Sequence, residues 1–226
     1  MALVKAWLQP SWQNTFISKG HAPKCIDCDP LNQTFGSLKA LNVQKLELLK
    51  DGEINPRLFD RLMETLLATE GNETFVIDNG SAGFLSLCDY MLSNHVMSLL
   101  EEEGHNVFIH CILVGGESLP DTLSGFAALA SSFPTASIVL WLNEFFGALG
   151  NLEDIEAFNK YSETVFAQVR LPKPKSSTFG EDLSELRKRK LTFEQGVHHK
   201  KFDTMVRRRL NSMRCGFFEA LEQSNL

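Results

Sequence analysis

The sequence contains no uninterrupted apolar run of the roughly 18 residues that a membrane-spanning helix requires. Its five cysteines are an odd number, which does not suit a fully paired disulfide framework and fits a reducing cytoplasm. It has no Gly-x-Ser-x-Gly elbow, no Ser-His-Asp order and no obvious pair of glycosidase acids. A Gly-x-x-x-x-Gly-Lys-Ser/Thr phosphate-binding loop is missing as well. These absences exclude the common hydrolase signatures and predict a cytoplasmic globular protein.

Length and charge set further bounds. A chain of 226 residues forms one large domain or two small ones and buries about 70–75% of its unfolded surface. Such a chain needs neither a disulfide nor a metal ion to hold its core together. The formal net charge of −6 gives no overall attraction to nucleic acid or to an anionic membrane.

Apolar strands alternate with helical stripes along the chain. We expect strands at residues 22–27, 75–77, 107–114, 137–142 and 165–171. We expect helices at residues 3–18, where Pro10 disturbs the pattern, and at 58–67, 84–100 and 119–132. This alternation predicts a three-layer α/β fold, with a mainly parallel sheet flanked by helices on both faces.

Two of the predicted strands end in acidic residues. Residues 25–32 read Cys-Ile-Asp-Cys-Asp-Pro-Leu-Asn, which places Asp27 and Asp29 at the end of the first strand. Asp78 closes Phe-Val-Ile-Asp, and the small residues at 80–83 would let the backbone approach a phosphate. Because ligands of open α/β sheets collect at the carboxyl ends of strands, these acids predict a Mg-nucleotide site. The alternative is that they only form turns.

Two further patterns have both a functional and a structural interpretation. Cys25-x-x-Cys28 has the spacing of zinc and thiol-redox sites, but no second pair follows at a suitable distance. We therefore interpret both residues as structural cysteines. Asn143 ends an apolar strand, where its amide suits either the edge of an adenine or a turn.

The C-terminal part differs in charge from the rest. Residues 187–215 contain ten Lys or Arg residues and two acids, out of 22 basic residues in the chain. A stripe of apolar residues predicts that the last helix packs one face and presents Arg207, Arg208 and Arg209 on the remainder. The stripe consists of Met205, Val206, Leu210, Met213, Phe217 and Leu221. Such a segment is either a solvated surface or a contact surface for DNA or an acidic protein.

A longer set of motifs resembles the TraL family of conjugal transfer proteins, over roughly residues 17–222. The string of motifs is more specific than any one of them. The matching motifs are Asp27-Cys28-Asp29-Pro30 with Asn32 and Thr34, Gly52-Glu53-Ile54-Asn55, Val76-Ile77-Asp78-Asn79-Gly80, Gly115-Gly116, Asp121-Thr122-Leu123-Ser124-Gly125-Phe126, Val139-Leu140-Trp141-Leu142-Asn143, Thr178-Phe179-Gly180 and Leu191-Thr192-Phe193.

TraL proteins are similar in turn to the ParA/MinD group of P-loop ATPases, which act as dimers on DNA, membranes or large assemblies. The resemblance implies binding of ATP and Mg²⁺, with Asp29 matching the acid that orients the hydrolytic water and Asp27 matching its neighbour at the strand end, a cofactor-binding position. Asp78 matches the Walker B acid near Mg²⁺, and Asn143 matches the residue that commonly contacts the adenine. The implied partners are proteins of the plasmid conjugation machinery, a second copy of the chain, and DNA through Arg207–Arg209.

The sequence departs from this family at its beginning. Lys19-Gly20-His21-Ala22-Pro23 is present, but the strand and the Gly-Lys-Gly-Gly-x-Gly-Lys-Ser/Thr loop that precede this turn in the family are absent. That strand belongs beside the strand of Asp78, and the loop supplies the groups that neutralise the phosphates. Three explanations stay open: a start upstream of Met1, a decayed gene, or a product that keeps only a docking role.

The resemblance also sets expectations for domains and activity. We expect a ParA/MinD-like nucleotide-binding domain over residues 1–185, incomplete at its N-terminus, and a basic helical extension over residues 186–226 packed on it. The main hypothesis is nucleotide-dependent switching in the DNA transfer machinery. The alternative is a non-catalytic interaction or regulatory protein of the same apparatus, so enzymatic activity stays open.

Overall fold

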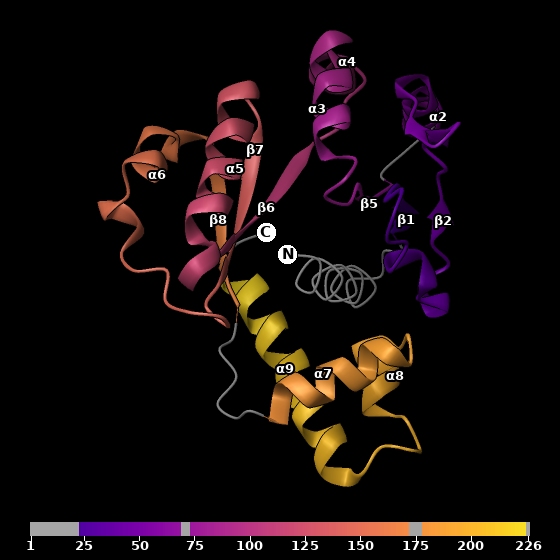
Figure 1. Ribbon diagram of the computed structural model, residues 1–226, viewed down its shortest axis with the longest axis vertical. Helices are drawn as coiled ribbons and strands as arrows, with labels where there is room; N and C mark the ends of the chain where they lie inside the picture. The colour runs from indigo at the N-terminus through magenta and orange to yellow at the C-terminus, as the bar shows by residue number, and fades with distance from the viewer. Residues whose placement is uncertain (1–22, 69–72, 172–177, 225–226) are drawn as a thin grey trace. The chain divides into compact units, whose positions relative to one another are not determined.

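The structure is a computed structural model that describes residues 23–68, 73–171 and 178–224 (Figure 1). The chain divides into two compact units, one made of residues 1–103 and 180–211 and the other of residues 104–179 and 212–226. The helix expected at residues 3–18 and the Lys19–Pro23 turn lie outside the described residues, apart from Pro23. This division does not test the domain boundary expected at residue 185, which remains a prediction.

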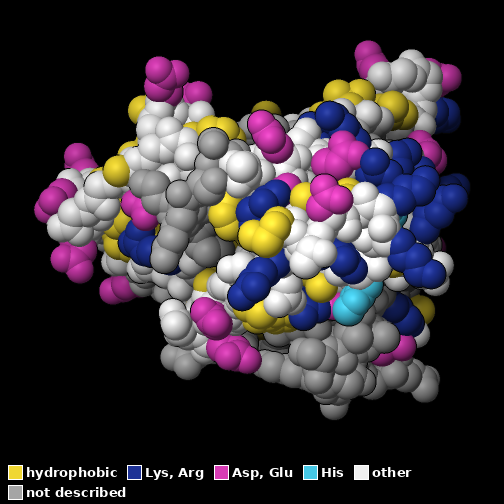
Figure 2. Space-filling model, turned by 90° about the horizontal axis from the view of Figure 1, so that it is seen from below, with side chains coloured by type: hydrophobic (Ala, Val, Ile, Leu, Met, Phe, Trp, Pro, Cys, Tyr) yellow, Lys and Arg dark blue, Asp and Glu magenta, His cyan; other side chains and the backbone are white. Residues whose placement is uncertain are grey.

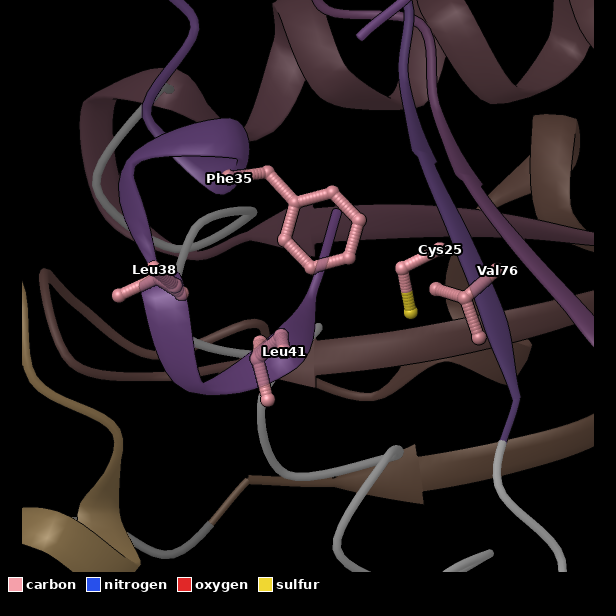
Figure 3. Packing of buried hydrophobic residues seen from close by; sticks show 5 residues of the cluster. All are labelled: Cys25, Phe35, Leu38, Leu41 and Val76. Atoms are coloured by element: carbon pink, nitrogen blue, oxygen red, sulfur yellow. The ribbon is translucent and has the colours of Figure 1, made fainter. Parts of the chain in front are cut away.

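The first unit contains a small parallel sheet. Strand β1 (Lys24–Asp27) lies between β2 (Gln44–Lys45) and β5 (Phe75–Asp78), and both pairings are parallel. A loop from residue 28 to residue 43 connects β1 to β2 and covers one face of the sheet with apolar side chains. Figure 3 shows the ring of Phe35, from this loop, directed toward Cys25 of β1 and Val76 of β5. This cluster, completed by Leu38 and Leu41, holds the loop against the strands whose ends carry the acidic residues.

Shorter elements complete this part of the unit. A hairpin joins β3 (Leu49–Lys50) to β4 (Glu53–Ile54) through Asp51 and Gly52, which both have positive φ angles as its tight turn requires. Helix α2 spans Asp60–Leu67, in agreement with the predicted helix at 58–67. The single helix predicted for residues 84–100 is wrong in one respect. The structure has α3 (Phe84–Ser93) and α4 (Val96–Glu102), because the backbone at His95 adopts the left-handed conformation and ends the first helix.

The second unit has a longer parallel sheet in the order β6-β7-β8. Its strands are β6 (Phe108–Val114), β7 (Ser137–Asn143) and β8 (Val165–Arg170), with α5 (Leu119–Ser132) and α6 (Glu156–Lys160) as the crossover helices. Every residue of β7 after Ser137 is buried, as expected for a central strand that is covered on both faces. Figure 1 shows α5 lying along this sheet.

Three helices follow the second sheet in the chain. They are α7 (Thr178–Lys188), α8 (Phe193–Val197) and α9 (Thr204–Gln223), which are grouped together in Figure 1. We call residues 180–211, which belong to the first unit, the helical module. Its core contains Leu186, Phe193, Phe202 and Leu210, all buried. Met205, predicted to lie on the packed stripe of the last helix, is instead exposed.

The α/β fold with parallel sheets flanked by helices is confirmed. Among the described residues, however, the strands form two three-stranded parallel sheets and one hairpin rather than a single sheet. Within the same residues β5 pairs only with β1, and β6 pairs only with β7. Each sheet therefore has two edge strands, β2 and β5 in the first and β6 and β8 in the second, whose outer backbone groups have no strand partner in the described part of the chain.

Candidate functional site

The structure brings Asp27, Asp29 and Asp78 together at one end of the first sheet. Asp27 and Asp78 are the last residues of β1 and β5, and they are paired in the register of these parallel strands. The chain leaves both strands at the same point, where the N–H of Cys28 donates to the carbonyl oxygen of Asp78 at 2.7 Å. All three acidic residues are buried. We call them the carboxylate cluster.

Each carboxylate of the cluster closes a local turn. The backbone N–H groups of Asp29 and Gly36 donate to the two oxygens of Asp27 at 3.0 and 2.6 Å. The Oδ1 atom of Asp29 accepts from the N–H groups of Leu31 and Asn32, both at 2.9 Å. The Oδ1 atom of Asp78 accepts from the N–H of Gly80 at 3.2 Å. The turn-forming interpretation of these acids is therefore confirmed, and the Mg-nucleotide interpretation stays a prediction.

Gly80 lets the loop after β5 lie against Asp29. Its φ angle is +62°, and a Cβ atom built on it would lie 2.2 Å from the Cγ atom of Asp29. No other residue type fits this contact without a shift of the carboxylate, and a positive φ is itself unfavourable for a side chain. A close approach of backbone was expected at residues 80–83, and here the approached group is a carboxylate.

Burial governs the ionisation of the cluster. It raises the pKa of Asp27, and the N–H groups of Gly36 and Asp29 oppose that rise, while the nearby charges of Asp78 and Asp29 add to it. Burial also raises the pKa of the Cys28 thiol to about 12, with Asp27 and Asp78 contributing. Such a thiol stays protonated and unreactive at neutral pH. Cys25 and Cys28 are both buried, which fits the structural interpretation.

The cluster has two carboxylate oxygens to offer a ligand. Among the described residues, no hydrogen-bond donor or cation is bound to Oδ2 of Asp29 or Oδ2 of Asp78, whereas both oxygens of Asp27 are occupied. The described ranges contain no group of three or more His, Cys, Asp or Glu side chains that would hold a metal ion unaided. A nucleotide-bound Mg²⁺ usually takes one or two carboxylates and completes its shell with water and phosphate. Asp29 and Asp78 fit that kind of site.

Three further residues of this site were given no role from the sequence. The Nδ2 group of Asn79 is buried beside the cluster and lacks a hydrogen-bond partner in the described part of the chain. Gly36 lies nine residues after Asp27 and donates to it. Lys45 is paired with Asp27 in the β1–β2 register, and its Nζ atom donates to Gln33 at 2.8 Å. Only the pairing of β1 with the two-residue strand β2 reveals Lys45, and so short a strand has no clear sequence pattern.

Asn143 lies in the second unit, at the end of β7. Its Oδ1 atom accepts from the N–H of Phe145 at 3.0 Å, so this residue too closes a turn. Its Nδ2 atom is buried and has no partner among the described residues. The loop that follows packs on the turn after β6, where a Cβ atom on Gly115 would lie 2.1 Å from the carbonyl oxygen of Gly147. The residue predicted to contact adenine thus has one amide donor without a partner in the described part of the chain.

The three arginines predicted to contact DNA or a partner have different surroundings. Arg209 forms a two-pronged ion pair with the buried carboxylate of Asp182, through Nε and through Nη2, the latter at 2.8 Å. Arg207 is half-buried, and its Nη2 atom lies 3.4 Å from the hydroxyl of Thr204. Arg208 alone is exposed. Within this group, a contact with an external partner therefore falls on Arg208.

Comparison with known proteins shows two relatives over nearly the whole chain, both named Protein TraL and both from Escherichia coli. They are 40% and 37% identical over 211 residues, which is 91% of this chain and 87% of each relative. No family model matches the chain, and no solved structure matches it significantly. Within the described residues, no helix combines the length and the apolar character that a membrane span needs. On its identity to these relatives, the chain belongs to the TraL protein family.

Proposed function

We propose that this TraL-family chain is a component of plasmid conjugal transfer whose carboxylate cluster binds a Mg²⁺-nucleotide and switches the protein between states. The observation that carries the proposal is the register of β1 and β5, which places Asp27, Asp29 and Asp78 at one strand end. Spare oxygens on Asp29 and Asp78 supply the metal side of such a site. The partners in this proposal are proteins of the transfer machinery and a second copy of the chain.

Each acidic residue has a defined task in the proposed site. Asp78 would hold Mg²⁺ or its water shell, and Asp29 would orient a water molecule beside the terminal phosphate. Asp27 uses both oxygens to fix the loop that carries Asp29, so its contribution to nucleotide binding is positional. The Nδ2 group of Asn79 is a donor of the type that a phosphate oxygen requires. ATP is the proposed nucleotide, and the cytoplasm is the proposed location, in line with the odd number of cysteines in the chain.

Thermal unfolding with MgATP tests this site. A ligand at 100 times its dissociation constant stabilises the folded state by about 2.7 kcal/mol, which gives an easily measured rise in melting temperature. We expect this rise with Mg²⁺ and ATP together, a smaller one with ATP in EDTA, and none in Asp78→Asn. Asp51→Asn is the matched control, because Asp51 is exposed in a turn with a positive φ that Asn also adopts.

A second candidate function is a binding protein of the transfer apparatus without nucleotide chemistry. The observation that favours it is that, among the described residues, no ion pair joins a Lys or Arg to the carboxylate cluster. A triphosphate would thus meet more negative than positive charge here. No MgATP-dependent shift in a folded wild-type protein would support this candidate and contradict the nucleotide site. Unchanged hydrolysis in Asp29→Asn would remove the proposed role of that residue alone.

A further inference from the structure

The helical module carries a dense positive charge on its surface. Residues 187–215 contain ten Lys or Arg residues and two acids, a net charge of +8, so the rest of the chain carries −14 of the total of −6. The structure separates the exposed cations of this segment from the half-buried ones, Arg207, Arg209 and Arg214. The exposed ones are Arg187, Lys188, Arg189, Lys190, Lys200, Lys201 and Arg208. We call these seven residues the basic surface.

Two separate runs of cations meet in this surface. The first run, Arg187–Lys190, occupies the end of α7 and the turn after it, and the second, Lys200–Lys201, lies between α8 and α9. The guanidinium carbon of Arg189 lies 5.6 Å from the centre of the Phe202 ring, which places the two runs side by side. Gly196 supports this arrangement, because a Cβ atom there would lie 2.3 Å from a methyl group of Leu186. Figure 2 shows Lys and Arg side chains gathered on one part of the molecular face, with a His beside them.

Few acidic groups neutralise this charge. Among the described residues, Arg189 is the one cation of the basic surface in an ion pair, with Glu185 at 2.7 Å. The nearby Glu194 contacts His198 at 2.9 Å. The favourable position of Arg187 and Lys188 near the helix C-terminus explains part of the run, but not Lys190, Lys200 and Lys201. A surface with this excess of unpaired cations attracts a polyanion.

The apolar content of the surface indicates which polyanion fits. Protein interfaces usually have an apolar core that is rich in aromatic side chains. Of the exposed large hydrophobic residues, one belongs to the helical module, Met205. The two phenylalanines of the module, Phe193 and Phe202, are both buried. Single-stranded nucleic acid also uses exposed aromatic rings, on which its bases stack. A lysine-rich surface without such rings suits the phosphate backbone of a duplex.

We propose that the basic surface binds double-stranded DNA through its phosphates, without reading the base sequence. This inference is independent of the nucleotide site, because none of its residues belongs to the carboxylate cluster. It moves the expected DNA contact from Arg207–Arg209 to the end of α7 and the turn before α9, with Arg208 as the shared residue. Arg209 is then a structural residue, held by Asp182.

Fluorescence anisotropy with a labelled duplex of arbitrary sequence tests the proposal. The test variant is Arg187→Gln/Lys188→Gln/Lys190→Gln, which leaves Arg189 in its packing contact. The control is Lys39→Gln/Lys50→Gln/Arg57→Gln, which removes the same charge from exposed positions outside the helical module. We expect the test variant to bind at least about tenfold more weakly at low salt and to lower the slope of log K against log salt by about 3, because each lost phosphate contact removes about 0.9. The control should match the wild type.

Four outcomes would overturn the proposal. The first is that the folded wild type shows no salt-dependent binding, and the second is an equal loss of affinity in both variants. The third is tighter binding of a single strand than of a duplex. The fourth is that polyglutamate displaces the labelled duplex as effectively as unlabelled duplex does, at equal total charge. The last result would assign the surface to an acidic protein. Circular dichroism of both variants separates lost contacts from lost folding, and Lys200→Gln/Lys201→Gln provides a second variant if the first does not fold.

Discussion

The two parallel sheets of this protein differ in length and in the polarity of the residues that they bury. The sheet β2-β1-β5 is short and ends in three buried carboxylates, whose oxygens hold the loops that follow the strands. The sheet β6-β7-β8 is longer, and its central strand is buried from Ile138 to Asn143 with mostly apolar side chains. Burying charge costs free energy, whereas burying apolar surface is the main source of stability. The polar strand end of the first sheet therefore lowers the stability of the fold, and the apolar core of the second sheet raises it.

The second sheet contains a neutral, hydrogen-bonded pair of polar side chains. The indole N–H of Trp141 donates to Nδ1 of His110 on the neighbouring strand at 3.1 Å. Burial lowers the pKa of His110 to about 3, so the ring is neutral at physiological pH and its other nitrogen carries the proton. This pair serves packing inside the second sheet, whereas two carboxylates of the first sheet retain unused oxygens.

The largest effect is expected where the first sheet is most tightly built. Gly80→Ala should destabilise the protein by about 3 kcal/mol, because the new methyl group meets Asp29 and the backbone keeps a positive φ. Gly52→Ala is the control, since its φ is +84° and nothing lies within 4 Å of a Cβ atom there. It should cost about 1 kcal/mol from the backbone alone. Urea unfolding measures both, and equal losses would show that the contact with Asp29 is not as close as described.

In the second sheet, the pair of His110 and Trp141 should be nearly as sensitive. Trp141→Phe removes buried volume and leaves Nδ1 of His110 without this donor, which should cost about 2–3 kcal/mol. Trp141→Phe combined with His110→Leu should recover part of the loss, because both polar groups are then gone. A double-mutant cycle of unfolding free energies checks this. Additive losses would mean that the hydrogen bond contributes little to the second sheet.

The sequence predicted the second sheet better than the first. Long apolar runs such as Phe108–Val114 and Ser137–Asn143 identify buried strands, and their alternation with helices implies parallel pairing. The two-residue strand β2 and the hairpin β3–β4 were not predicted, because such short segments have no periodicity to detect. The break at His95 was missed for a related reason, since apolar residues continue on both sides of it.

For the candidate site, the sequence predicted the strand-end acids but not their bonding. Asp27, Asp29 and Asp78 meet because parallel strands end at the same edge of a sheet, which periodicity implies. The donors that occupy Asp27 come from Asp29 and from Gly36, and only the folded loop brings Gly36 to it. Likewise, Arg208 and Arg209 are identical neighbours in sequence. The buried partner Asp182, 27 residues before Arg209, decides which of them is structural.

The pH dependence of stability should separate the two sheets. Between pH 6.5 and about 3, unfolding exposes His110 to protonation, so the unfolded state binds the extra proton and stability falls as the pH falls. One such group contributes a slope of about 1.4 kcal/mol per pH unit. The folded-state pKa of Asp27 is raised, so its effect has the opposite sign, with stability lost as the pH rises through that pKa.

The two contributions are separated by single variants. His110→Gln should flatten the fall in unfolding free energy between pH 6 and pH 4, and Asp27→Asn should steepen it. Urea unfolding at intervals of half a pH unit gives the slopes. If His110→Gln leaves the slope unchanged, the imidazole is solvated enough to accept a proton in the folded state, and the pH dependence does not distinguish the two sheets.

The smallest effect on stability is expected at Asn143, where the second sheet does carry an unpaired polar atom. Asn143→Ala loses the hydrogen bond from the N–H of Phe145, which destabilises the fold. It also removes a buried amide donor that is unpaired in the described part of the chain, which stabilises the fold. Because the two changes offset, the net cost should stay below about 1 kcal/mol. If that amide contacts the nucleotide base, MgATP should bind about tenfold more weakly, which corresponds to about 1.4 kcal/mol. Calorimetric titration beside urea unfolding measures both quantities on one variant. An unchanged affinity with a large loss of stability would make Asn143 a turn residue like Asp27, and the second sheet would then have no polar atom kept for a ligand.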